Sequence, residues 1–106
     1  GLPPGRYDTE LCELEILTDG RLVIAGQDQL LAGASQPIGV GVAKVMDFAG
    51  ISLGTAVDMA TKHPTELLGL PVVELVAGQP AEIVHFELIR DHQGPQLQVV
   101  ETVSAG

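Results

Sequence analysis

The sequence predicts an α+β fold: a β-hairpin, two to three helices, and then a second β-hairpin. Three observations predict it. Apolar residues alternate on both sides of an Asp-Gly pair near the amino terminus, apolar residues recur at helical spacing in the middle, and two further alternating runs flank a Gly-Pro pair near the carboxy terminus. Strands and helices are therefore segregated along the chain, which is the α+β pattern.

The first hairpin is predicted over residues 10–25. Apolar and polar residues alternate along 10–17, as in a strand with one buried face. Asp19-Gly20 is a strong hairpin signal, and 21–25 supplies the returning strand. Residues 1–9, rich in Pro and Gly, are predicted to form a loop, and 26–28 to end the second strand. The predicted buried face consists of Cys12, Leu14 and Ile16.

A first helix is predicted over residues 37–48. Pro37 suits the first turn of a helix, where its missing N–H costs nothing, and Gly50 is placed to cap the end. Gly39 and Gly41 each lower the helix propensity by about 1 kcal/mol relative to Ala. We therefore expect the backbone to come close to another part of the molecule there. The predicted buried face consists of Ile38, Val42, Val45 and Met46.

A second helix is predicted over residues 53–62, with Ser52 as its N-cap. Pro64 is predicted to stop this helix and to begin a short turn over 65–68, closed by Gly69. Helical spacing predicts one buried face. That face consists of Leu53, Ala56, Val57 and Ala60.

The last third of the chain is predicted to hold the second hairpin. Residues 82–89 and 96–103 alternate like strands, and 91–95 connects them. A further short strand is predicted over 72–76, within an otherwise irregular stretch from 70 to 80.

Composition excludes several classes of partner. The chain carries 14 Asp and Glu against five scattered Lys and Arg, a formal net charge of −9. Because phosphate recognition needs clustered basic residues, we expect neither nucleic acid nor a membrane as partner. Cys12 is the only cysteine, which favours a reducing, cytoplasmic setting. The chain begins without Met, so we expect a piece of something longer or a processed product.

The residues that usually carry chemistry are scattered. His63 precedes a proline at a helix junction and is interpreted as a capping residue. His85 lies in a predicted strand and is interpreted as a surface or a satisfied core position. His92 is interpreted as a solvated residue of the hairpin turn. Cys12 lies on an apolar strand face and is interpreted as an inert thiol. Ser35 has no histidine near it in sequence. We expect no catalytic residue and no metal site formed by this chain alone.

The stretch DQLLAGASQPIGVG, residues 28–41, leaves two interpretations open. Small residues crowd together just before the predicted helix. They could form only a tight approach to that helix, or a loop whose small side chains let a ligand come close to the backbone.

Three ordered blocks carry a resemblance to a known family. They are GLPPGRYD at 1–8, TDGRLVIAGQDQLLAGAS at 18–35 and FAGISLGTAVDMATKHPTELLGL at 48–70, with a looser match over 76–86. In this order they resemble the carboxy-terminal part of N-acetylglucosamine-6-phosphate deacetylases, which belong to the amidohydrolase superfamily.

The resemblance implies a TIM-type barrel that carries the metal site, and a small β-sandwich made from both chain termini. Residues 1–70 would be the last barrel loop, the hairpin and the closing helices, and 71–106 part of the sandwich. The catalytic Asp and the metal-ligating His and Glu would lie upstream of this chain. The intact enzyme would bind a divalent metal such as zinc. Its substrate-binding residues in this chain would be Leu31, Ala32 and Gly33, followed by Ala34 where the family usually has Ser.

The resemblance therefore implies a fragment of a metal-dependent enzyme that deacetylates N-acetylglucosamine 6-phosphate or a similar amino-sugar phosphate, and the isolated chain would be inactive. Two alternatives are a stand-alone, non-catalytic binding or assembly module, and a piece of another amidohydrolase, dihydroorotase-like or imidazolonepropionase-like. Strand faces that lose their cover in a fragment also predict a homo-oligomer, most simply a two-fold dimer.

Overall fold

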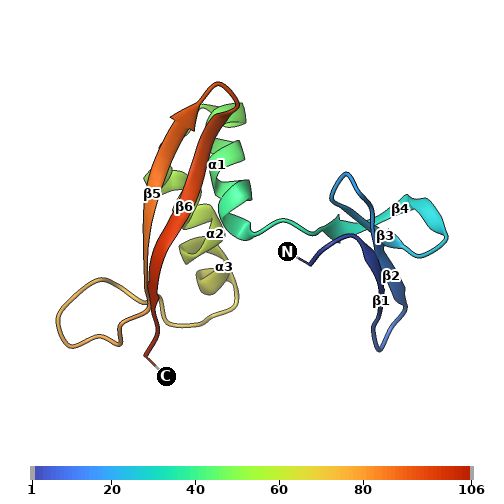
Figure 1. The fold of residues 1–106 in the computed structure, drawn as a ribbon. Helices are drawn as coiled ribbons and strands as arrows, with labels where there is room; N and C mark the ends of the chain where they lie inside the picture. Colours follow the sequence, from blue (N-terminus) through green and yellow to red (C-terminus); the bar gives the residue numbers. More distant parts are fainter. Residues whose placement is uncertain (1, 106) are drawn as a thin grey trace. The chain divides into compact units, whose positions relative to one another are not determined.

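The computed structural model describes residues 2–105 and divides into two compact units, Gly1–Pro37 and Ile38–Gly106. The first unit is a sheet and the second combines three helices with a hairpin (Figure 1). The units divide inside the segment 1–70 that the family resemblance treats as one part. The division at 70/71 refers to the longer enzymes and stays a prediction.

The first unit is a four-stranded antiparallel meander in the order β1-β2-β3-β4. Its strands are β1 (Gly5–Asp8), β2 (Glu13–Ile16), β3 (Arg21–Ile24) and β4 (Gln27–Ala34). The predicted hairpin is confirmed as β2 and β3. Ile16 and Val23 are the buried residues of this sheet, at 5% and 0% exposure. Cys12 and Leu14, on the predicted face, are half-buried.

Two predictions about the amino-terminal stretch are wrong. Residues 1–9 are not all loop, because β1 pairs with β2 and Arg6 reaches across to the carboxylates of Glu13 and Glu15, at 3.3 and 3.7 Å. The strand predicted to begin at residue 10 begins at Glu13. Thr9 forms a turn with Cys12 instead: its backbone N–H and its hydroxyl both donate to the Cys12 carbonyl, at 3.1 and 2.7 Å.

The first helix of the second unit, α1 (Ile38–Ala49), is confirmed. Gly50 follows at φ +63°, the left-handed cap expected of it. A Cβ at Gly39 would lie 3.7 Å from the Cβ of Leu97, so the predicted close approach is real there, whereas at Gly41 nothing lies within 4 Å. Ile38 was predicted to be buried but is 74% exposed, at the first position of the helix.

The second helix, α2 (Leu53–Ala60), begins as predicted: the Ser52 hydroxyl accepts a hydrogen bond from the backbone N–H of Thr55. It ends earlier than predicted, at a break formed by Thr61, whose hydroxyl donates to the Val57 carbonyl at 2.8 Å. Pro64 therefore does not stop α2. It lies in the first turn of a third helix, α3 (Lys62–Leu67), where proline is tolerated.

The second hairpin is confirmed and is longer than predicted. β5 (Ile83–Asp91) pairs with β6 (Gly94–Val103) in a two-stranded antiparallel sheet. The turn is only two residues long, because Asp91 pairs with Gly94 and the Asp91 carboxylate accepts the backbone N–H of Gln93 at 2.8 Å. The strand predicted over 72–76 is absent; backbone bonds from Val76 to Glu74 and from Gln79 to Val76 make turns there.

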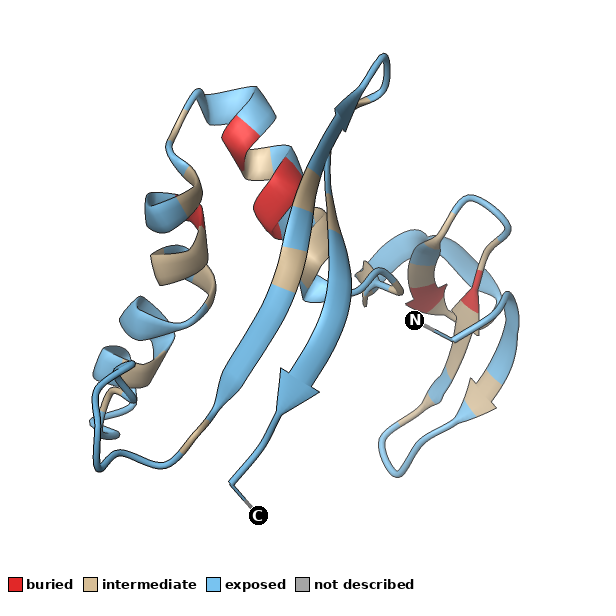
Figure 2. Cartoon of the chain, turned by 60° about the vertical axis from the view of Figure 1, so that its left-hand side comes forward, coloured by how far each residue is buried: buried red, intermediate tan, exposed pale blue. Residues whose placement is uncertain are grey.

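The core of the second unit lies where α1 meets α2 and β6. Helical spacing predicted most of it. Figure 2 shows the buried residues of this unit on its helices. The buried cluster is Val42, Met46 and Ala56, with Val45, Ile51, Leu53, Val57, Ala60, Leu88 and Leu97 partly buried against it. None of the helices described among residues 2–105 has the length and apolar character needed to span a membrane.

Candidate functional site

The residues predicted to meet a ligand, Leu31, Ala32 and Gly33, lie in a β-strand. Both interpretations of this stretch, as a tight approach to a helix and as a ligand-facing loop, are therefore wrong about its conformation, since β4 runs through it to Ala34 and α1 begins only at Ile38. The contact with a ligand stays a prediction. The pairing of β4 with β3 is irregular. Leu22 is opposite Gly33 and Val23 is opposite Leu31, which leaves Ala32 as an extra, bulged residue.

This part of β4 is open to an approaching molecule. Leu31 is 68% exposed, Ala32 is exposed, and Gly33 is half-buried over Leu22. Gly33 has φ +152°, a backbone conformation that side chains rarely adopt. β4 is also an edge of the meander, so one side of its backbone is unpaired within the described sheet. The small residues Ala32 and Gly33 on an unpaired backbone edge suit close contact with a polar ligand.

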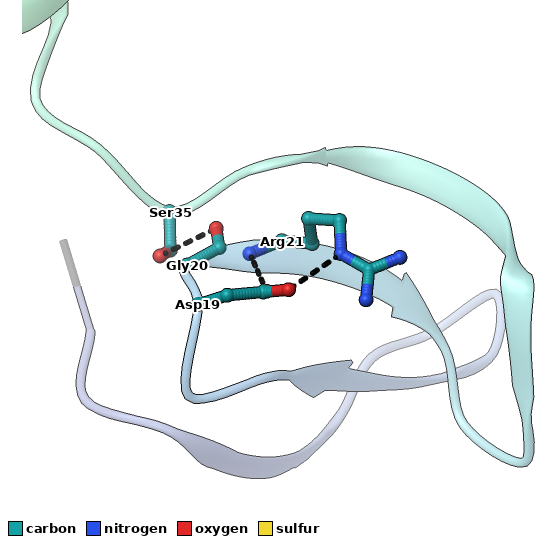
Figure 3. Close-up of polar contacts among 4 residues, drawn as sticks. All are labelled: Asp19, Gly20, Arg21 and Ser35. Atoms are coloured by element: carbon teal, nitrogen blue, oxygen red, sulfur yellow. Dashed lines mark hydrogen bonds and ion pairs between the residues drawn. The ribbon is translucent and has the colours of Figure 1, made fainter.

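A polar cluster closes the end of β4 against the β2–β3 turn (Figure 3). Both the hydroxyl and the backbone N–H of Ser35 donate to the carbonyl of Gly20, at 3.1 and 3.3 Å. Asp19 accepts from the backbone N–H of Arg21 at 3.1 Å and from its guanidinium at 2.8 Å. The backbone N–H of Leu17 donates to the Arg21 carbonyl, so the loop between the strands is the three residues 18–20. Gly20 ends this loop at φ +86°.

The same turn borders an open groove. Its lining includes the side chains of Asp19, Ser35 and Gln36 together with Pro3 and Pro4. In the sequence, Asp19-Gly20 is only a turn signal and does not predict this groove. The turn signal alone could not reveal it, because the groove forms only when the end of β4 folds back over Gly20.

Hydrogen bonding lowers the pKa of the Asp19 carboxyl. The backbone N–H of Arg21 contributes most, followed by its guanidinium, and both favour the charged form. Because the pKa is lower in the folded chain than in the unfolded one, the ionised carboxylate stabilises the fold above the ordinary pKa. This stabilisation is lost as the pH falls toward the lowered value.

We therefore expect Asp19→Asn to weaken the acid sensitivity of the meander. The variant keeps an oxygen for the Arg21 N–H but has no titrating group. Between pH 7 and pH 3, the melting midpoint should fall less in the variant than in the wild type. The effect should be small, since both side chains are about half exposed. Equal drops in the two proteins would contradict the prediction.

The residues considered for catalysis and metal binding do not converge. His63 lies within α3 and is exposed, and no side chain caps that helix, so the capping interpretation is wrong. His92 in the hairpin turn is exposed, as predicted, and His85 on β5 is exposed, which decides for the surface position over the core position. Among residues 2–105, no group of three or more His, Cys, Asp or Glu is placed to hold a metal ion.

Two curated proteins of Escherichia coli are similar to this chain. One, from strain K12, is provisionally named an N-acetylgalactosamine-6-phosphate deacetylase, and the other, from O157:H7, is named an N-acetylgalactosamine-6-phosphate deacetylase. Each is 31% identical over 89 residues, which is 82% of this chain. The chain resembles the amino-sugar-phosphate deacetylases. The resemblance to this family is therefore confirmed, although the relatives' names specify galactosamine where glucosamine was expected.

The similarity covers only part of each relative. The matched segment is 52% of the first and 23% of the second, so the chain spans about half or less of their lengths. No family model matches the chain. No solved structure matches it either.

Proposed function

We propose that this chain is the carboxy-terminal part of a metal-dependent amidohydrolase, located in the cytoplasm, that removes the acetyl group from an N-acetylated amino-sugar phosphate. N-acetylglucosamine 6-phosphate and its galactosamine epimer are the substrates to test. The observation that carries the proposal is the 31% identity to deacetylases over 82% of the chain. In this proposal the sheet and helices belong to the end of a TIM-type barrel and to a composite β-sandwich.

The contribution of this chain would be to hold the sugar phosphate. Ala32 and Gly33 present little side-chain bulk, and β4 has unpaired backbone N–H and C=O groups along one edge. Such groups can bond to sugar hydroxyls or phosphate oxygens at close range. The Asp19 carboxylate, on the turn beyond the end of β4, would disfavour a phosphate beside it.

The described residues do not fit the metal that the family implies. No cluster of three or more candidate ligands exists among residues 2–105, so we assign no step of hydrolysis to this chain. When bound elsewhere in the intact enzyme, the metal would activate a water molecule for attack on the amide. The ligands and the proton-transferring Asp would come from the upstream barrel.

We expect the isolated chain to be inactive. Incubated with either sugar phosphate and zinc, it should release no acetate above a protein-free control, and dialysed protein should retain no stoichiometric zinc. Acetate release and elemental analysis measure the two results. A full equivalent of tightly bound zinc would contradict the assignment of the metal site to the missing part.

The substrate contact can be tested in a chain extended by its upstream coding region. Ala32→Leu should raise KM for the sugar phosphate by about tenfold or more, because the added bulk blocks the approach to β4. Gln29→Leu is the matched control: it lies on the same strand, is exposed, and is outside the predicted contact. Equal KM values in both variants, with unchanged melting, would remove the predicted contact but leave the deacetylase assignment standing.

One observation keeps the stand-alone module as a second candidate. A match of 89 residues is 52% of one relative and 23% of the other, so the first is less than half the length of the second. Short relatives therefore occur. The upstream reading frame distinguishes the two candidates: a barrel sequence with an HxH motif and a strand-end Asp supports the enzyme, and a stop codon or an unrelated domain supports the module.

A further inference from the structure

We propose that Ser35 is a positioning residue, whose hydroxyl fixes the register of β4 and so places the backbone of residues 31–33 for the sugar phosphate. This inference rests on the proposed function, because the sugar phosphate is the ligand that β4 would meet. It adds a side chain outside the predicted contact. Three observations carry it: the exposure of β4, its irregular pairing with β3, and the hydrogen bonds of Ser35 to the β2–β3 turn.

Burial does little to fix the register of β4. Gly33 is half-buried and the other seven residues of this strand are exposed. The register of a strand is set chiefly by the apolar side chains that it buries, because a slip by one residue turns them to the opposite face. β4 buries no such side chain, so its register must be held by polar contacts.

The pairing of β4 with β3 is regular only at its carboxyl end. Arg21 is opposite Ala34 and Leu22 is opposite Gly33, but the register then shifts twice, and residues 28–30 have no partner in the described pairing. The predicted contact residues therefore lie between an irregular half of the strand and its regular end. Whatever holds that end also holds the contact.

Ser35 holds that end against the β2–β3 turn (Figure 3). Its hydroxyl and its backbone N–H both donate to the Gly20 carbonyl, at 3.1 and 3.3 Å. The turn that carries this acceptor is itself closed, because the Gly20 N–H donates to the Leu17 carbonyl at 3.0 Å and the Leu17 N–H to the Arg21 carbonyl at 2.9 Å. The hydroxyl bond is partly buried, so water competes less for it.

The expected consequence is a change in binding and not in chemistry. Backbone groups of successive strand residues point to opposite edges, so a slip by one residue would change which N–H and C=O groups β4 offers at its free edge. Poorer contact with a part of the substrate remote from the reacting amide raises KM and leaves kcat unchanged. Simple destabilisation of the protein would instead lower the active fraction.

The kinetic test uses the chain extended by its upstream coding region. Ser35→Ala should raise KM for the sugar phosphate about fivefold, the effect of one hydrogen bond, and leave kcat within about twofold. Ser35→Thr keeps a hydroxyl and should keep the wild-type KM. Thr18→Ala is the matched control, because it removes an exposed hydroxyl from the same turn and leaves both bonds of Ser35.

Nuclear magnetic resonance of the 106-residue chain tests the register without substrate. Cross-strand Overhauser contacts between Leu22 and Gly33 should weaken in Ser35→Ala and persist in Ser35→Thr. Those between Leu14 and Ile24, which pair β2 with β3, should stay as in the wild type in both variants. Unchanged contacts between Leu22 and Gly33 in Ser35→Ala would overturn the proposed mechanism.

The outcomes separate this inference from the proposed function. An extended wild-type chain that releases no acetate would overturn the deacetylase assignment, and with it the role of Ser35 in substrate binding. An active chain in which Ser35→Ala keeps the wild-type KM would overturn the role of Ser35 alone. So would a Ser35→Thr variant as impaired as Ser35→Ala, or an equal rise of KM in Thr18→Ala.

Discussion

Replacing Ala56 by aspartate should unfold the second unit. Ala56 is 1% exposed and lies in the buried cluster with Val42 and Met46. A carboxylate there would have no partner and no space, and an unpaired buried charge costs several kcal/mol. That cost is comparable to the whole stability of a small domain. We expect the variant to lose its cooperative melting transition and most of its helical circular dichroism at pH 7.

Two neighbouring variants provide a graded control for this prediction. Thr55→Asp changes an exposed residue in the first turn of α2, where a negative charge favours the helix, so its stability should be unchanged or slightly higher. The stability of Val57→Asp should lie between that of Ala56→Asp and that of Thr55→Asp, because Val57 is only half-buried and borders an open cleft. Equal melting midpoints for Ala56→Asp and Thr55→Asp would show that the assigned core is wrong.

The helices could be predicted because their signals are local. The Ser52 cap, Gly50 and the spacing of Leu53, Ala56 and Val57 all lie within a few turns of the elements they define. The end of α2 could not be placed, since the helix breaks in the backbone of Thr61, at φ −130° and ψ −74°, and a threonine in the sequence does not signal such a break. Pro64 gave the stronger signal and was misleading, because proline is as compatible with the start of a helix as with its end.

Strands β1 and β4 could not be predicted because their pairing is not local to their own sequences. β1 is short and rich in turn-forming neighbours, and it becomes a strand through its register with β2 and the ion pairs of Arg6. β4 has no regular alternation, and its register with β3 shifts twice. A run of small residues fits a bulged strand as well as a loop.

The candidate site, too, could be predicted only in part. The sequence drew attention to Leu31, Ala32 and Gly33, and the structure places them on an exposed strand edge. The groove beside Asp19 and Ser35 could not be anticipated, because it depends on two segments 15 residues apart meeting at the Gly20 carbonyl. Substrate chemistry came only from the resemblance, since no set of metal ligands or catalytic groups stands out in the chain itself.

Replacing Val23 by aspartate should unfold the meander of the first unit. Val23 is fully buried, and Ile16 is the other buried residue of this sheet. So small a core leaves little stability in reserve, because units of fewer than about 40 residues rarely fold on apolar burial alone. An unpaired carboxylate at this position, at a cost of several kcal/mol, should exceed that reserve.

Hydrogen exchange read residue by residue tests this directly. In Val23→Asp, the amides of β2, β3 and β4 should exchange at rates typical of an unfolded chain, while those of α1 and β6 keep their protection. Gln29→Asp adds the same charge to an exposed position of β4 and should leave both patterns as in the wild type. If α1 and β6 lost protection together with the meander, the two units would fold as one cooperative body, and the small core around Val23 would be supported by more than its own sheet.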